Sequence, residues 1–197
     1  MELTPAHRAE VVRLANTFGE PRRADAFITN DFFDPIHRPD RFGEVCMVVR
    51  RPNGKLLLAI KTFYPRGAYR LPTGGIAHDE PILDALRRET EEETGLGTKV
   101  RSFLAQIAYR PRSSPDGPPI FHTFAFLLDE VGGTLAARDE EEQIEDYLEV
   151  PPSELRAVAD RLERLTSASS DRIGGDWADW GKFRAVVHRV VADALGT

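Results

Sequence analysis

A Gly-Gly turn followed by a dense acidic segment constrains this chain more than any other feature. The segment reads LPTGGIAHDEPILDALRRETEEETGL and spans residues 71–96. Pro81 suits the first turn of a helix, and Gly95 suits the position just after its last turn. The stretch therefore predicts a tight backbone turn that is followed at once by a helix over residues 81–94.

The acidic side chains of this helix fall on one face. At about 100° per residue, Glu89, Glu92 and Glu93 occupy positions i, i+3 and i+4, beside the stripe that faces the core. Like charges at this spacing repel one another, and a solvated acidic face is one interpretation. The other is a bound divalent cation, because converging carboxylate oxygens suit Mg²⁺ or Mn²⁺. Such ions commonly bridge phosphate oxygens and activate water.

The rest of the chain mixes strand-like and helix-like patterns. Two apolar runs flank Pro52-Asn53-Gly54 and predict a β-hairpin, since Asn-Gly favours positive φ. Further elements are expected as strands at 68–72, 99–110, 120–131 and 147–150, and as helices at 5–18, 153–165 and the C-terminal end. Hairpins mixed with helices predict an α/β (α+β) fold with a mixed sheet, and argue against a purely parallel one.

Three parts of the chain are expected from these patterns. Residues 1–43 comprise an N-terminal helix and an irregular connection with an aromatic patch at Phe32 and Phe33. Residues 44–165 form the main domain. Residues 166–197 comprise a flexible linker, 166–176, and a C-terminal helix.

Both terminal helices are amphipathic. Their apolar stripes consist of Val11, Leu14, Ala15 and Phe18 at one end and of Trp180, Phe183, Val187, Val190 and Ala194 at the other. Neither helix is stable alone in water at this length, so each stripe is expected to pack on the main domain or on a second copy of the protein. Because symmetric pairing is the commonest mode of association, a homodimer is expected.

Composition narrows the class of protein. A formal net charge of −6 argues against non-specific nucleic-acid binding. The single cysteine, Cys46, lies in an apolar run and is expected to be a buried, inert thiol. No apolar stretch approaches the ~20 residues of a membrane span, and the first residues lack a signal-peptide core. We expect a cytoplasmic protein that does not associate with membranes.

The acidic segment resembles the Nudix box, the pattern G-x5-E-x7-R-E-U-x-E-E-x-G-U in which U is aliphatic. The matching positions are Gly74, Glu80, Arg88, Glu89, Glu92, Glu93, Gly95 and Leu96. Thr90 departs from the pattern, because it stands where an aliphatic residue is usual. The charged and glycine positions all match, so the motif is specific. The resemblance covers about residues 44–160.

The resemblance implies a Nudix hydrolase with an α/β/α sandwich fold and a Mg²⁺ or Mn²⁺ cofactor. It implies that Glu92 and Glu93 are the principal metal ligands and that a backbone carbonyl near Gly74 joins them. Glu89 matches a residue that binds metal in some members and acts as the general base in others. Arg88 matches the arginine that orients these carboxylates.

Substrate contacts are expected from basic residues that flank the turn. Lys61, Arg66 and Arg70 are candidates for binding the substrate phosphates, with ordinary surface charge as the alternative. The acidic run 139–142 could supply a base or an extra metal ligand, although a solvated loop is the simpler interpretation.

The expected substrate is a nucleotide-type small molecule, a nucleoside diphosphate linked to another moiety. Pro111 lies about fifteen positions past the box, where a proline marks ADP-ribose hydrolases of the family. ADP-ribose or a nucleoside diphosphate sugar is therefore favoured. The alternatives are a nucleoside triphosphate pyrophosphohydrolase and a nucleotide sensor that does not catalyse, which usually has a degraded box. An isopentenyl diphosphate isomerase would need a catalytic cysteine, and the position of Cys46 argues against that.

Overall fold

The computed structural model describes residues 2–29 and 33–197, so Phe32 of the expected aromatic patch lies outside the described residues. The main strands are β1 (Arg22–Ile28), β2 (Arg41–Arg50), β3 (Leu56–Lys61), β4 (Thr73–Ala77), β5 (Leu96–Pro111), β6 (Phe121–Gly133) and β7 (Ile144–Val150). The helices are α1 (Pro5–Phe18), α2 (Ile82–Thr94), α3 (Leu155–Glu163) and α4 (Trp177–Leu195), with short 3-10 turns η1 (Glu140–Glu142) and η2 (Pro152–Glu154).

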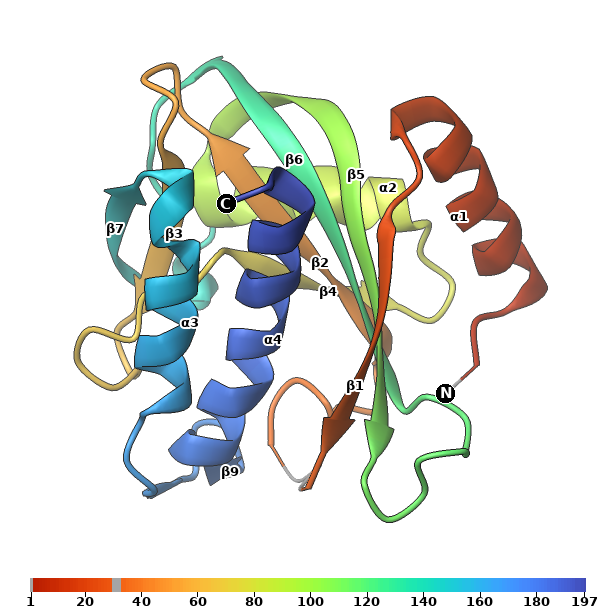
Figure 1. Cartoon of the computed structure of the whole chain (residues 1–197). Helices are drawn as coiled ribbons and strands as arrows, with labels where there is room; N and C mark the ends of the chain where they lie inside the picture. The colour runs from red at the N-terminus through yellow and green to blue at the C-terminus, as the bar shows by residue number, and fades with distance from the viewer. Residues whose placement is uncertain (1, 30–32) are drawn as a thin grey trace.

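A mixed sheet lies between two helical layers (Figure 1). The strand order is β1-β5-β6-β2-β3-β7, and β4 pairs with β2 outside this path. β1 runs parallel to β5 and β2 runs parallel to β6, whereas the other pairs are antiparallel. The expected α/β (α+β) sandwich with a mixed sheet is therefore confirmed.

The central strands are apolar on both faces because each face of the sheet is covered. Successive side chains of a strand point to opposite faces, so β2 supplies Val45 and Met47 to one core and Cys46 and Val48 to the other. The first core includes residues of α1 and α2, and the second includes residues of α3 and α4. This double burial explains the continuous apolar run VCMVV in the sequence.

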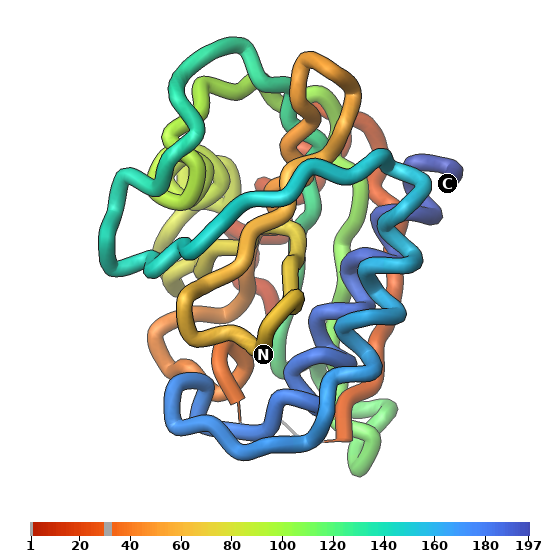
Figure 2. Tube along the Cα trace, turned by 90° about the vertical axis from the view of Figure 1, so that its left-hand side faces the viewer, coloured from red at the N-terminus to blue at the C-terminus, as the bar shows by residue number. Residues whose placement is uncertain are grey.

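Both terminal helices pack on the same chain. Val11 and Leu14 of α1 join the core that contains α2, and Trp180 and Val187 of α4 join the opposite core. Figure 2 shows α4 lying beside α3 along one side of the molecule. Ala194, which the stripe of α4 includes, is exposed. The sequence predicts that each stripe packs on the main domain or on a second copy, and in the structure both stripes pack on the main domain. Within the described ranges, none of the helices combines the length and apolar composition that crossing a bilayer requires.

The expected irregular connection at residues 19–43 contains the edge strand β1. Its side chains are mostly exposed or half-buried, so its sequence RRADAFI lacks an alternating apolar pattern. Likewise, the expected linker at 166–176 contains a small hairpin of β8 (Ser169–Ser170) and β9 (Gly175–Asp176). Residues 68–72 contribute only an isolated bridge between Ala59 and Arg70, not a separate strand.

Candidate active site

Helix α2 carries the acidic cluster, and its first turn is capped by a residue from another helix. The residue at its N-cap, Pro81, makes no side-chain capping bond. The N–H groups of Ile82 and Leu83 instead donate to Glu10 of α1, at 3.0 Å and 3.1 Å. Glu10 is buried, and a carboxylate at this end of a helix is stabilised by the helix dipole. This role has no signal in the sequence, since nothing local links residue 10 to residue 82.

Arg88 links the box residues of the turn to those of the helix. Its guanidinium donates to Glu80 at 2.8 Å and 3.0 Å, to Glu89 at 2.7 Å and to Glu92 at 2.9 Å. It also donates to the carbonyl oxygen of Gly75 at 3.0 Å. One arginine thus contacts three carboxylates and links the Gly-Gly turn to the helix.

Glu89 lies directly under the Gly-Gly turn. A Cβ atom at Gly74 would lie only 1.9 Å from the carboxyl carbon of Glu89, so only glycine allows this approach. Burial raises the pKa of Glu89 to about 7, against the opposing effect of its bonds with Arg88. The first glycine of the box therefore has a structural reason in this chain: it makes room for a buried carboxylate.

Glu93 is the most deeply buried carboxylate of the cluster, with 1% of its surface exposed. Neither of its carboxylate oxygens has a hydrogen-bond partner within the described residues. The nearest cationic groups, Lys61 Nζ and an Arg70 guanidinium nitrogen, both lie 3.7 Å from Oε1. Burial raises the pKa of Glu93, and Arg70 and Lys61 oppose that shift. Glu93 is therefore paired with two cations that lie beyond hydrogen-bond distance, and its interaction with Glu142 adds to the rise of its pKa, so its oxygens remain suited to bind a metal ion.

These features fit a hard divalent ion. The available donors are carboxylate oxygens, which Mg²⁺ and Mn²⁺ prefer, and the turn at Gly74 leaves no side chain in the way. In residues 2–29 and 33–197, however, no three His, Cys, Asp or Glu side chains are grouped closely enough to hold an ion. Two of the three carboxylates on the acidic face, Glu89 and Glu92, instead accept hydrogen bonds from Arg88.

Of the acidic run at 139–142, one member reaches this cluster. Glu142 accepts a hydrogen bond from Lys61 Nζ at 2.7 Å, whereas Glu140 and Glu141 are exposed. Burial acts to raise the pKa of Glu142, but Lys61 outweighs it and holds that pKa below the ordinary value. The simpler interpretation of a solvated loop therefore does not hold for Glu142, but it agrees with the exposure of Glu140 and Glu141.

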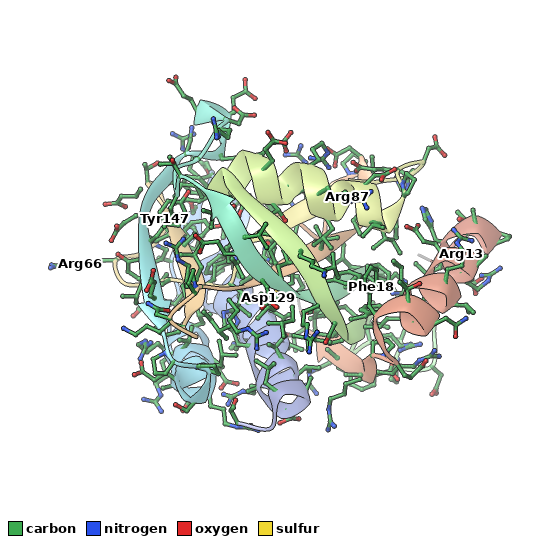
Figure 3. All side chains as sticks on the ribbon, turned by 90° about the horizontal axis from the view of Figure 1, so that it is seen from above. Arg13, Phe18, Arg66, Arg87, Asp129 and Tyr147 are labelled. Carbon is green, nitrogen blue, oxygen red and sulfur yellow. The ribbon has the colours of Figure 1, made fainter. Side chains whose placement is uncertain are left out.

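The three basic residues that the sequence offers as candidates for binding the substrate phosphates lie in different surroundings. Arg70 is buried, and it donates to the Leu71 carbonyl at 2.8 Å and to the Tyr64 hydroxyl at 3.2 Å. Lys61 lies beside it between two carboxylates. Arg66 is exposed on the loop after β3 and projects away from the body of the molecule (Figure 3). The structure therefore brings Arg70 and Lys61 to the acidic cluster and leaves Arg66 outside it.

The C-terminal helix adds a second buried charge near the turn. Arg184 of α4 donates to both carboxylate oxygens of Glu44 in β2, at 2.9 Å and 2.7 Å. The hydroxyl of Thr123 donates to the same carboxylate at 2.9 Å. Neither Arg184 nor Glu44 is predicted from the sequence, because the two are 140 residues apart and neither belongs to the acidic motif.

Comparisons with known proteins show what this chain is similar to. A model of the NUDIX domain matches residues 40–169. The ADP-ribose pyrophosphatase of Methanocaldococcus jannaschii is 36% identical over 102 residues, which cover 51% of this chain and 57% of that protein. The NAD-capped RNA hydrolase NudC of Vibrio atlanticus is 33% identical over 101 residues, which cover 51% of this chain and 34% of that protein. The chain thus matches only part of the length of these curated relatives.

Solved structures include an ADP-ribose pyrophosphatase from Streptococcus suis, with a TM-score of 0.47 and 16% identity over 79% of this chain and 92% of that chain. A hydrolase from Nitrosomonas europaea has a TM-score of 0.46 and 22% identity over 59% of this chain and 76% of that one. The family model covers more than half of the chain, and every charged and glycine position of the acidic motif is present. The protein therefore belongs to the Nudix family.

Proposed function

We propose that this protein hydrolyses a pyrophosphate bond in a nucleoside diphosphate linked to another moiety, and that it requires Mg²⁺ or Mn²⁺. The observation that carries the proposal is the carboxylate of Glu93, which is buried without a hydrogen bond beside Glu89. Burying such a carboxylate costs folding free energy. A divalent ion offsets that cost and explains why the chain retains the group.

We assign the ion to Glu92, Glu93 and Glu89, together with the backbone carbonyl of Gly74. When bound, the ion polarises a phosphoryl oxygen and lowers the pKa of a water molecule. Arg88 keeps the carboxylates oriented through the bonds described above. The family resemblance makes Glu89 and Arg88 the catalytic pair.

In the proposed reaction, water breaks the bond between one phosphorus atom and the bridging oxygen. The oxygen of water bonds to one phosphorus atom, and the bond from that phosphorus to the bridging oxygen breaks. The bridging oxygen leaves with the second phosphoryl group, so two monophosphates form. The proton of the attacking water passes to Glu89, with Glu142 as the alternative base because it lies at the same cluster. Arg70 and Lys61 supply positive charge beside the phosphates.

ADP-ribose or a nucleoside diphosphate sugar is the proposed substrate. A curated relative over half of this chain is named ADP-ribose pyrophosphatase, and Pro111 ends β5 at the position expected for that subgroup. The complete set of box carboxylates argues against a sensor that only binds nucleotide. A nucleoside triphosphate pyrophosphohydrolase remains the enzymatic alternative.

A substrate panel tests the proposal directly. Product release is measured from ADP-ribose, a nucleoside diphosphate sugar, ATP, NADH and NAD-capped RNA, with Mg²⁺ and with excess EDTA. We expect ADP-ribose to be hydrolysed fastest and EDTA to abolish turnover. Full turnover in EDTA contradicts the metal requirement, and a tenfold preference for ATP contradicts the substrate assignment.

Variants of the acidic segment test the site itself. Glu93→Gln is expected to lower kcat/KM by at least about 100-fold, the upper end of losses seen when residues that merely support metal ligands are removed. The control is Glu91→Gln, which changes the same residue type on the same helix at an exposed position. Equal activities for the two variants contradict the assignment of Glu93.

Three wider features remain proposals. We propose that residues 44–165 are the hydrolase domain, that residues 1–43 and 166–197 are extensions docked on it, and that the protein works in the cytoplasm. The homodimer also stays a prediction, although the buried stripes of α1 and α4 do not require a second copy. Light scattering of the full chain at several concentrations tests the dimer, and a constant monomer mass contradicts it.

A further inference from the structure

A small cavity opens beside the Gly-Gly turn and is closed by parts of the chain that lie outside the family match at residues 40–169. Gly74 and Gly75 form one wall. Arg172 of the β8–β9 hairpin and Trp180 and Arg184 of α4 form another. The cavity therefore lies next to the acidic cluster, and the C-terminal segment contributes to its shape.

The size of the cavity limits what can enter it. Its volume is about 110 Å³. That equals roughly three to four water molecules at the ~30 Å³ that each occupies in the liquid. Pockets that enclose a drug-sized ligand measure about 300–1,000 Å³. The cavity therefore accommodates one small chemical group and not a whole nucleotide.

The charge of the cavity selects an anionic group. Its lining includes the basic residues Arg41, Lys61, Arg70, Arg172 and Arg184 and the acidic residues Asp34 and Glu44. Four of the five basic residues pair with carboxylates: Arg41 with Asp40, Lys61 with Glu142, Arg70 with Glu93 and Arg184 with Glu44. Among the described residues, Arg172 therefore supplies the positive charge that is left for an anion.

The two C-terminal arginines of the lining differ in their contacts. Arg184 is 5% exposed and donates to both carboxylate oxygens of Glu44. Arg172 is exposed and lies over the ring of Phe63 at 5.6 Å, and in the described parts of the chain it makes no ion pair. By contrast, Arg41 and Lys61 already contact Asp40 and Glu142. An anion in the cavity would pair with Arg172 and lie beside the charge of Arg184.

We propose that Arg172 and Arg184 bind, in this cavity, the phosphoryl group that departs with the second half of the substrate. The inference rests on the proposed pyrophosphate hydrolysis, which supplies such a group next to the acidic cluster. It makes the C-terminal segment, and not the Nudix motif alone, a determinant of substrate binding. It also favours substrates in which the departing half carries a terminal phosphoryl group, because the cavity accommodates one small group.

The test measures binding without turnover, so it does not depend on the proposed reaction. Inorganic phosphate is titrated into the full chain in EDTA at low ionic strength, by calorimetry. We expect Arg172→Met to weaken binding about tenfold, the loss typical of one charge-assisted hydrogen bond. The control is Arg164→Met, which removes an arginine that is 79% exposed and does not line the cavity. It is expected to bind phosphate like the unmodified protein.

A second variant addresses the buried arginine. Arg184→Met would leave Glu44 buried without a partner and could prevent folding, so Arg184→Lys is the better change. The lysine keeps a cation for Glu44 but lacks the planar fork of donors. We expect weaker phosphate binding with a retained cooperative melt. If this variant does not fold, Arg172→Met decides the question alone.

Kinetics with the best substrate of the panel separate binding from catalysis. We expect Arg172→Met to raise KM several-fold and to change kcat less, whereas a merely structural role would leave KM unaltered in a folded variant. Phosphate binding that is equal in Arg172→Met and the unmodified protein overturns the inference even if hydrolysis is confirmed. So does absence of phosphate binding by the unmodified protein. Phosphate binding that depends on Arg172, in a protein that hydrolyses nothing, supports the cavity and contradicts the proposed function instead.

Discussion

Replacing Glu10 by alanine tests whether the N-terminal helix stabilises the helix that carries the acidic cluster. The change removes both acceptors for the N–H groups of Ile82 and Leu83, and the cavity it leaves lies at a buried helix end. Loss of a helix cap costs about 0.5–2 kcal/mol, and each buried donor left unsatisfied costs about 1–3 kcal/mol. Because these terms overlap, we expect a loss of about 2–4 kcal/mol in the free energy of unfolding.

The expected loss converts to a measurable change in melting temperature. For a chain of this length, 1 kcal/mol shifts the melting temperature by about 2–4 °C, so Glu10→Ala should melt about 4–16 °C lower. Glu10→Gln keeps one oxygen acceptor and should lose about half as much. Glu20→Ala is the control, because Glu20 is 69% exposed and forms an ion pair with the exposed Arg23. Its change in the free energy of unfolding should stay within about 0.5 kcal/mol.

Calorimetry in metal-free buffer measures all three variants. If Glu10→Ala melts within about 1 °C of the unmodified protein, the bonds to α2 contribute nothing and the capping argument is wrong. If Glu20→Ala loses as much as Glu10→Ala, the effect belongs to the loss of a glutamate in the N-terminal segment in general and not to the cap.

The remaining predictions concern the turn, a buried histidine and the base. Gly74→Ala should lower kcat/KM at least tenfold, because its Cβ displaces Glu89, whereas Gly97→Ala, whose Cβ meets nothing nearer than 3.6 Å, should keep full activity; equal activities would contradict the steric argument. Burial lowers the pKa of His188 to about 4 from the ~6.5 of an unfolded chain, so the unfolded state takes up the extra proton. The contribution of neutral His188 to the free energy of unfolding is therefore fully present above about pH 6.5. It falls as the pH decreases toward 4, by about 2 kcal/mol at pH 5. If a melting series of His188→Gln shows the same dependence on pH, that dependence comes from other groups. Glu142→Gln should retain more activity than the glutamine variant of Glu89, and the reverse order in steady-state assays would identify Glu142 as the base.

Local patterns were enough to predict the helix at 81–94 and the hairpin around Asn53-Gly54. The structure has α2 at Ile82–Thr94 and joins β2 to β3 through that turn. Both predictions rest on short-range physics: a helix end or a tight turn is decided by the backbone preferences of a few adjacent residues. The same is true of the acidic face, whose geometry follows from the helical repeat alone.

The edge strand β1 could not be predicted from such local patterns. β1 was expected to be irregular, because an edge strand with exposed side chains shows no alternation of apolar residues. Its conformation is fixed by its parallel pairing with β5, more than 80 residues away in the chain. Pairing between backbones leaves no signature in side-chain composition, so only the folded sheet reveals it.

Local patterns in the sequence predict the acidic face of the helix and the turn before it. The contacts of Glu10 with α2, of Glu142 with Lys61 and of Arg184 with Glu44 are visible only in the folded chain. These contacts join residues 72, 81 and 140 positions apart. No local preference encodes such pairs, because each joins two elements that meet only when the sheet has formed and the helices have packed on it.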